Sequence, residues 1–203
     1  MRFFYGGLIV TALLLFTAGA LSIPFFYEST TLWYKMGLDK TMLQTGQVLG
    51  MLALVLLAIQ IILAVRTRLL VSVFGLAAVM RYHRLNGVLV ALVAFAHVVL
   101  VLAPEGFGNL PIGIKYWPEM VGGGLFLSVL FMSFSSHFRE RLGLDYGKWR
   151  SVHKPLGYMT PFLLLVHVLF VSDSFEQVVP KIALLATFVV GLGLVLVSKK
   201  MGD

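Results

Sequence analysis

The chain has 203 residues, of which 59% are hydrophobic and only 12% charged, with a formal net charge of +7 and a mean hydropathy of +0.94. So few ionisable groups cannot cover a water-facing surface, which excludes an ordinary soluble domain and predicts an integral membrane protein. The absence of cysteine excludes disulfides, iron–sulfur clusters and zinc sites built on sulfur.

Six apolar segments are long enough to cross about 30 Å of hydrocarbon as helices. In chain order they are 3–26, 47–65, 82–103, 120–137, 152–172 and 178–198. The first runs uncharged to Tyr27, longer than a signal-peptide core, so we expect a retained helix. Residues 69–80 are apolar but too few to cross, which predicts a helix at the membrane surface. The expected fold is all-α: one domain over 1–203, without internal repeats, whose six-helix transmembrane bundle has its core at about 45–198.

The charges in the loops set the expected orientation. One set of loops, together with both chain ends, carries Arg2, Arg66, Arg68, Arg81, Arg84, Arg139, Arg141, Lys148, Arg150, Lys154, Lys199 and Lys200. The other set carries the remaining lysines and most of the acidic residues. By the positive-inside rule we expect both termini in the cytoplasm and a multi-pass protein of the plasma membrane, or of the inner membrane in a bacterium. This explains the basic charge through the lipid bilayer alone, so we expect no nucleic-acid partner.

Four of the five histidines form two pairs with the same spacing of fourteen residues, His83 with His97 and His153 with His167. Fourteen residues return a helix to within about 40° of its starting direction and advance it by about 21 Å, so each pair shares a helix face. The two helices run in the same direction. We therefore expect His83 to face His153 near the cytoplasm and His97 to face His167 near the outer surface. The fifth, His137, is expected to be solvated at a helix end.

Two facing imidazoles without a nearby carboxylate are typical of haem, whose porphyrin supplies the other four iron ligands. The sequence therefore predicts two stacked haem sites. We expect the propionates to meet basic residues at the cytoplasmic helix ends, and glycines one turn after the first histidine of each pair to leave room for the macrocycle. These residues are Arg81, Arg84, Arg150 and Lys154, and Gly87 and Gly157.

Three other interpretations stay open. The histidines can be hydrogen-bonded residues of the bundle that hold no cofactor. His83 and His153, at helix ends, can be merely interfacial, which would leave one haem. A proton or metal transporter is the third, supported by Gln60 within a span and by Pro155 and Pro161 in the fifth.

Two segments resemble a known family. Residues 81–87 (Arg-Tyr-His-Arg-Leu-Asn-Gly), leading to Phe95-Ala96-His97, resemble the third-helix signature of ferric-reductase-like transmembrane domains. Residues 149–154 (Trp-Arg-Ser-Val-His-Lys), leading to Leu-Leu-Val-His at 164–167, are similar to the fifth-helix signature. The resemblance covers about 45–198. The superfamily includes ferric-chelate reductases, NADPH oxidases and the haem-binding membrane subunit of a bacterial methionine sulfoxide reductase system.

The resemblance implies an oxidoreductase in which two b-type haems pass electrons from a cytoplasmic flavin to an acceptor on the outer face, ferric ion or oxygen. It implies that His83 and His153 hold the inner haem and His97 and His167 the outer one, with Phe162 between the two levels.

Larger relatives bind FAD and NADPH in domains after the sixth helix, but this chain lacks a dinucleotide fingerprint. We therefore expect FAD and NADPH in a missing domain or a partner flavoprotein, and no catalytic acid–base residues here. The alternative is a standalone cytochrome b subunit that delivers electrons to a partner enzyme of the methionine sulfoxide reductase type.

Overall fold

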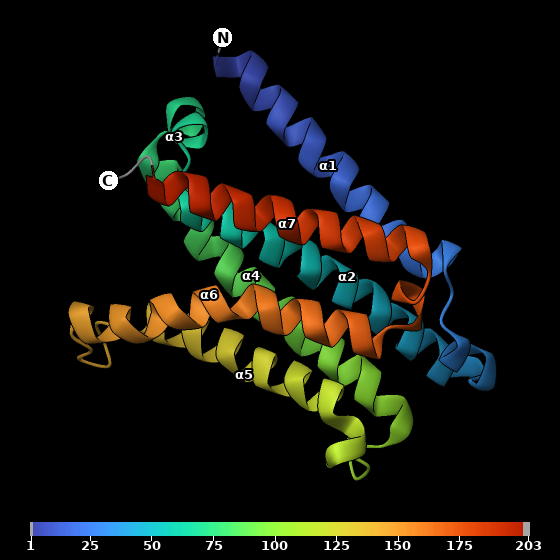
Figure 1. The fold of residues 1–203 in the computed structure, drawn as a ribbon. Coiled ribbons are helices and arrows are strands. Elements are labelled where there is room, and N and C mark those ends of the chain that lie inside the picture. Colours follow the sequence, from blue (N-terminus) through green and yellow to red (C-terminus); the bar gives the residue numbers. More distant parts are fainter. Residues whose placement is uncertain (1, 201–203) are drawn as a thin grey trace.

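The computed structural model describes residues 2–200, with side chains described for residues 2–197. This part of the chain is all-α, and six of its helices are long and apolar enough to cross a membrane, as the sequence predicted (Figure 1). They are α1 (Arg2–Phe26), α2 (Gly37–Val65), α4 (Leu76–Leu102), α5 (Trp117–His137), α6 (Tyr146–Val171) and α7 (Val178–Lys200). Some residues of the expected domain and charge pattern lie outside the described part of the chain. They are Met1, residues 201–203 and the side chains of Lys199 and Lys200.

Three helices, α2, α4 and α6, begin well before the apolar segments that predicted them. Helix α2 starts at Gly37 rather than at residue 47, with Asp39 in its first turn, where a negative charge is favourable at the helix dipole. Helix α6 starts at Tyr146 because the Asp145 side chain caps it, accepting a hydrogen bond from the Lys148 N–H at 3.0 Å. The starts of α2 and α6 are not apolar, so hydropathy alone does not mark them.

The helix predicted over 69–80 is divided in the structure. A short helix, α3 (Arg68–Phe74), begins where the Thr67 hydroxyl accepts a hydrogen bond from the Leu70 N–H at 3.3 Å. It ends at Gly75, whose φ of +81° is accessible mainly to glycine. Residues 76–80 therefore belong to α4. Helix α3 packs against α1 and α4; its location at a membrane surface stays a prediction.

Helix α2 is the centre of the bundle. On one side, its Met51, Leu54 and Val55 form a buried cluster with α1 and α7. On another side, its Leu56 and Leu57 form a second cluster with α4 and α5. The start of α1 diverges from the bundle toward α3 (Figure 1). Many large apolar side chains on the outer faces of the helices are exposed, as expected for helices that meet lipid.

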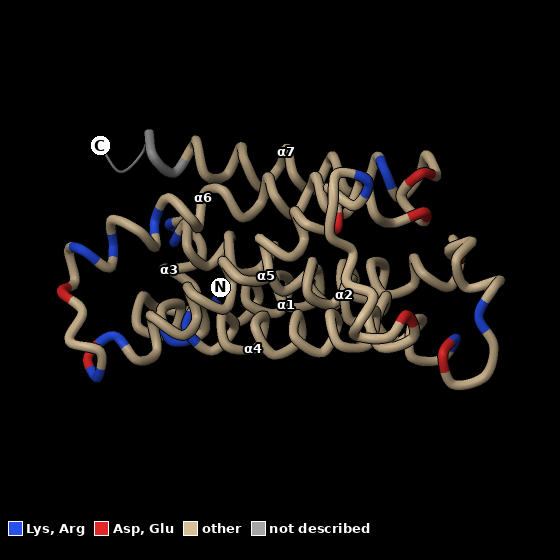
Figure 2. Tube along the Cα trace, turned by 90° about the horizontal axis from the view of Figure 1, so that it is seen from below, with Lys and Arg blue, Asp and Glu red and all other residues tan. Residues whose placement is uncertain are grey.

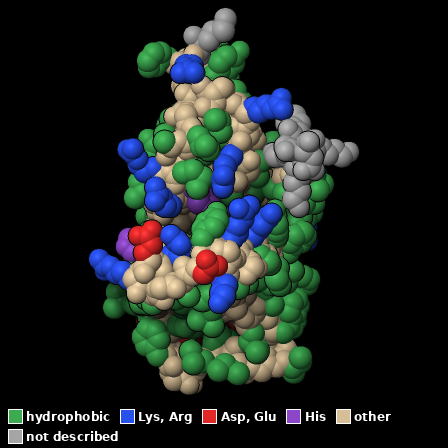
Figure 3. Space-filling view, turned by 90° about the vertical axis from the view of Figure 1, so that its left-hand side faces the viewer, with side chains coloured by type: hydrophobic (Ala, Val, Ile, Leu, Met, Phe, Trp, Pro, Cys, Tyr) green, Lys and Arg blue, Asp and Glu red, His purple; other side chains and the backbone are tan. Residues whose placement is uncertain are grey.

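Charged residues gather at the two ends of the bundle, and the surface between them is nearly uncharged (Figure 2). We call one of these the basic end, where the start of α1, α3 and the α5–α6 loop lie. Its described basic residues are Arg2, Arg66, Arg68, Arg81, Arg84, Arg139, Arg141, Lys148, Arg150 and Lys154. Figure 3 views this end, where Lys and Arg side chains surround exposed histidine. The opposite end holds the loops between α1 and α2, α4 and α5, and α6 and α7.

Asp173 joins two loops at the opposite end. Its Oδ2 accepts hydrogen bonds from the Ser29 hydroxyl at 2.8 Å, the Thr30 hydroxyl at 2.7 Å and the Thr30 N–H at 3.1 Å. The neighbouring Ser174 hydroxyl donates to the Tyr27 carbonyl at 2.6 Å. These bonds hold the α6–α7 loop against the α1–α2 loop.

Candidate functional site

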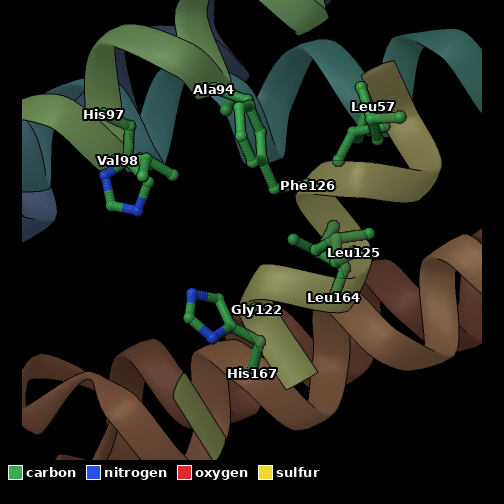
Figure 4. Close-up of a pocket in the computed structure, with 12 residues that line it drawn as sticks. Leu57, Ala94, His97, Val98, Gly122, Leu125, Phe126, Leu164 and His167 are labelled. Carbon is green, nitrogen blue, oxygen red and sulfur yellow. The ribbon is translucent and has the colours of Figure 1, made fainter. Parts of the chain in front are cut away.

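The four paired histidines lie at two levels of the bundle, on α4 and α6. We call His83 and His153 the inner pair, since they are nearer the basic end, and His97 and His167 the outer pair. The outer rings face each other across a cavity (Figure 4). At the inner level, His83 and His153 lie close enough to interact electrostatically. The pairing in depth that the spacing predicted is therefore present.

The cavity between the outer histidines is apolar. It has a volume of about 80 Å³ and opens into a larger space of about 510 Å³ that includes the surroundings. Apart from the two histidines, the residues around it are Gly50, Ala53, Leu57, Ala94, Val98, Gly122, Leu125, Phe126, Val129 and Leu164. No charged side chain is among them, so the cavity suits a neutral, flat apolar group held by the two imidazoles.

Each outer imidazole is held by a backbone carbonyl of a neighbouring helix. His97 Nδ1 lies 2.8 Å from the Gly46 carbonyl of α2, and His167 Nδ1 lies 3.1 Å from the Pro118 carbonyl of α5. A carbonyl only accepts, so Nδ1 carries the proton in both rings and Nε2 has the free lone pair. Neither Nε2 makes a hydrogen bond to any described residue, which leaves both as potential metal ligands.

The inner pair has different surroundings. Gln60 of α2 donates from Nε2 to the His83 carbonyl at 3.0 Å, and the same Nε2 is 3.4 Å from His83 Nε2. Asn86 donates to Gln60 Oε1 at 2.7 Å and to the Leu56 carbonyl at 2.9 Å. His83 Nδ1 is buried without a hydrogen-bond partner among the described residues. A polar network therefore occupies this side of the inner level.

On α6, the ring of His153 stacks on Trp149, with ring centroids 4.6 Å apart. Its Nδ1 is 3.4 Å from the Ser136 hydroxyl of α5, a long contact compared with the carbonyl bonds of the outer pair. The orientation of the inner rings is thus set by side chains, whereas the backbone sets that of the outer rings.

The model of the ferric reductase-like transmembrane component family matches residues 49–143. Over these residues, just under half of the chain, the sequence is similar to that family. This similarity implies transmembrane electron transfer and suggests haem binding. No curated protein and no solved structure matches the chain significantly.

The family segment runs from α2 to the α5–α6 loop and includes His83 and His97, while His153 and His167 lie beyond it on α6. The outer site nevertheless fits the haem that the family suggests. It offers two neutral imidazoles with available Nε2 atoms, no competing carboxylate in the cavity, and an apolar lining. Among the described residues, no group of three or more His, Cys, Asp and Glu is placed to hold a metal ion without such a cofactor.

The glycines predicted to make room for haem do not contact a histidine. A Cβ on Gly87 would meet the Gln60 amide at 3.1 Å, and a Cβ on Gly157 would meet nothing within 4 Å. The glycines that contact the outer histidines are instead Gly50 and Gly122. The sequence pointed to neither glycine as a histidine contact, since the only signal was a glycine within an apolar helix.

The basic residues expected at the propionates, Arg81, Arg84, Arg150 and Lys154, are all exposed at the basic end. None of the four forms an ion pair with a described residue, although the Arg150 guanidinium lies 6.0 Å from the centre of the Tyr146 ring. Their charge is available to an anionic group at this end, and their contact with a haem stays a prediction.

One aromatic residue, Phe162, differs from its expected place between the two haem levels. Phe162 does not line the cavity: it is 50% exposed and packs edge-on against Phe188 of α7, with ring centroids 5.2 Å apart. Phe126 of α5 lines the cavity instead (Figure 4). His137 is the last residue of α5 and is exposed, with its ring against Phe138.

Proposed function

We propose that the chain transfers electrons across a membrane through two b-type haems, one at each histidine pair. The observation that carries this proposal is the outer pair, whose Nδ1 atoms are both bonded to carbonyls and whose Nε2 atoms are both free beside a shared apolar cavity. His97 and His167 would ligate the outer iron, and His83 and His153 the inner one. Bound haem would supply the one-electron redox chemistry.

The chain's own residues would bind the haems, orient them and keep water away from them. Leu57, Val90, Leu125 and Val129 pack in one buried cluster between α2, α4 and α5. Such a core excludes water and ions from the space between two redox sites. Apart from the two histidines that would hold the iron, none of the described residues lining the cavity is an acid or a base, so a reaction confined to electrons is the chemistry that this lining supports.

The charge distribution supports an orientation. With the basic end in the cytoplasm, both termini are cytoplasmic, and the multi-pass protein lies in the plasma membrane, or in the inner membrane of a bacterium. Arg81, Arg84, Arg150 and Lys154 would then meet the propionates of the inner haem and an anionic flavin donor. In this proposal the chain would form a single haem-binding domain with its core at about 45–198.

The direction of transfer follows from this orientation. Electrons would pass from a cytoplasmic flavoprotein domain or subunit that uses FAD and NADPH to ferric ion or oxygen at the outer face. The protein would act as the membrane domain of an enzyme like a ferric reductase or NADPH oxidase.

The polar network at the inner level favours a second candidate. Gln60 lies within 3.4 Å of His83 Nε2, where an iron would bind. If this network excludes the inner haem, one haem at the outer pair would serve a cytochrome b subunit that passes electrons to a partner enzyme, as in the methionine sulfoxide reductase type of system.

An absorption spectrum of detergent-purified protein, oxidised and dithionite-reduced, with haem counted per chain, separates the candidates. Two low-spin haems support the two-haem path, and one haem supports the subunit role. No haem, in folded protein expressed with haem available, would refute both and return the histidines to proton or metal transport.

A further inference from the structure

The two outer histidines are held by the same local arrangement on two different helices. Gly46 and Gly50 of α2 contact His97, and Pro118 and Gly122 of α5 contact His167. In each case a carbonyl accepts from Nδ1, and a glycine follows four residues later. We call this arrangement the carbonyl–glycine motif.

Helix geometry explains why a glycine stands at the fourth position. Side chains in a helix tilt toward its N-terminus, so the residue at i+4 covers the carbonyl of residue i. Without a side chain there, an imidazole can approach the helix and share that carbonyl. A Cβ on Gly50 would lie 2.9 Å from Nδ1 and Cε1 of His97. A Cβ on Gly122 would overlap Nδ1 and Cε1 of His167 even more severely.

The motif occurs in two helix pairs, α2 with α4 and α5 with α6, which form the two halves of the site. Helix α2 supplies the contacts of the α4 histidines, and α5 supplies those of the α6 histidines. The residue after each accepting carbonyl, Gln47 or Glu119, has a buried side-chain oxygen without a hydrogen-bond partner among the described residues. The sequence showed no internal repeat, since the two halves share contacts rather than an obvious pattern of residues.

The inner level lacks the motif. Gly87 faces Gln60, Gly157 faces open space, and His83 Nδ1 has no partner among the described residues. The two levels therefore differ in how firmly their rings are held.

We propose that Gly50 and Gly122 are positioning residues of the outer haem site, each holding one axial imidazole against a helix carbonyl with Nε2 toward the iron. This inference rests on the proposed haem function. A hydrogen bond from Nδ1 to a carbonyl fixes the tautomer and raises the basicity of the ligand. The motif therefore sets the ligand geometry and lowers the reduction potential of the outer haem relative to an unbonded imidazole.

The experiment compares Gly50→Ala and Gly122→Ala with two controls in the full chain. Gly123→Ala alters the neighbouring glycine of the same helix, where a Cβ meets nothing within 4 Å, and Gly19→Ala adds a Cβ with nothing within 4 Å on α1. Each purified variant is measured for haem per chain, for the low-spin ferric EPR signals and for reduction potentials, with circular dichroism to verify folding.

We expect Gly122→Ala, with the worse overlap, to lose the outer haem, so that the count falls from two to about one, or from one to none if only the outer site is loaded. Gly50→Ala should keep the haem, shift its EPR signal and raise its potential, while both controls match the wild type. If Gly122→Ala does not fold, Gly50→Ala decides. A haem-containing wild type whose Gly50→Ala variant has unchanged signals and potential overturns this inference and leaves the proposed function standing; a wild type without haem overturns both.

Discussion

Removing the carboxylate of Asp173 should loosen the joint between the two loops at the end opposite the basic end. Three hydrogen bonds from Ser29 and Thr30 converge on Oδ2. Bonds to a charged group contribute about 1.5–3 kcal/mol each, but Asp173 is only partly buried, so we take less than half of that. Asp173→Ala should therefore lower the free energy of unfolding by about 2 kcal/mol, or the Tm by roughly 4–8 °C for a chain of this size.

The same bonds predict a pH dependence. Partial burial acts to raise the pKa of Asp173, but hydrogen bonds from Thr30, Ser29 and Thr31 outweigh it and hold the pKa below its ordinary value. A depressed pKa means that the folded state favours the carboxylate. The stabilisation of the fold by the Asp173 carboxylate is complete above the pKa of the unfolded state, about 3.9. It is lost as the pH falls through the lower pKa of the folded state.

Thermal unfolding in detergent, followed by circular dichroism at pH 7 and at a series of pH values below 5, measures both effects. Glu176→Gln is the matched control, since this exposed carboxylate of the same loop makes no side-chain hydrogen bond to a described residue. Asp173→Asn should lose stability at pH 7 and show a weaker acid dependence than the wild type. Equal Tm values for wild type and Asp173→Asn at pH 7, with the same acid dependence, would refute the reasoning.

Three further substitutions test the haem sites. His97→Ala should remove the outer haem and leave the inner one, and loss of both from folded protein would count against separate sites. Glu119 interacts electrostatically with His167, so Glu119→Gln should raise the outer haem potential in a redox titration. Two unit charges about 16 Å apart interact by about 1 kcal/mol at an effective dielectric constant of about 20, which corresponds to roughly 40 mV for one electron. An unchanged potential would mean that the Glu119 carboxylate is too far from the haem to act on it. Gln60→Leu removes two interhelical bonds at His83 and Asn86, worth about 0.6 kcal/mol each in membrane proteins, and should change only the inner haem's EPR signal; a change confined to the outer signal would contradict this assignment.

Hydropathy and helix periodicity predicted the features that depend on local sequence, namely the membrane spans and the depth of the histidine pairs. The six spans were predictable because each helix must satisfy its own backbone hydrogen bonds in lipid and bury few charges. The two histidine pairs were predictable in depth because fourteen residues of helix have a fixed rise and rotation. The N-terminal turns of α2 and α6 were missed, since capping and dipole effects at Asp145 and Asp39 leave no hydropathy signal.

Only the tertiary structure decided which residues complete the site. Gly46 and His97 are 51 positions apart, and Pro118 and His167 are 49 apart. Their contacts depend on how α2 packs on α4 and α5 on α6, and a helix pattern does not encode the rotation of its neighbours. For this reason, spacing within one helix predicted Gly87 at the haem. Packing between helices instead places Gly50 against an outer imidazole and Gly87 beside Gln60.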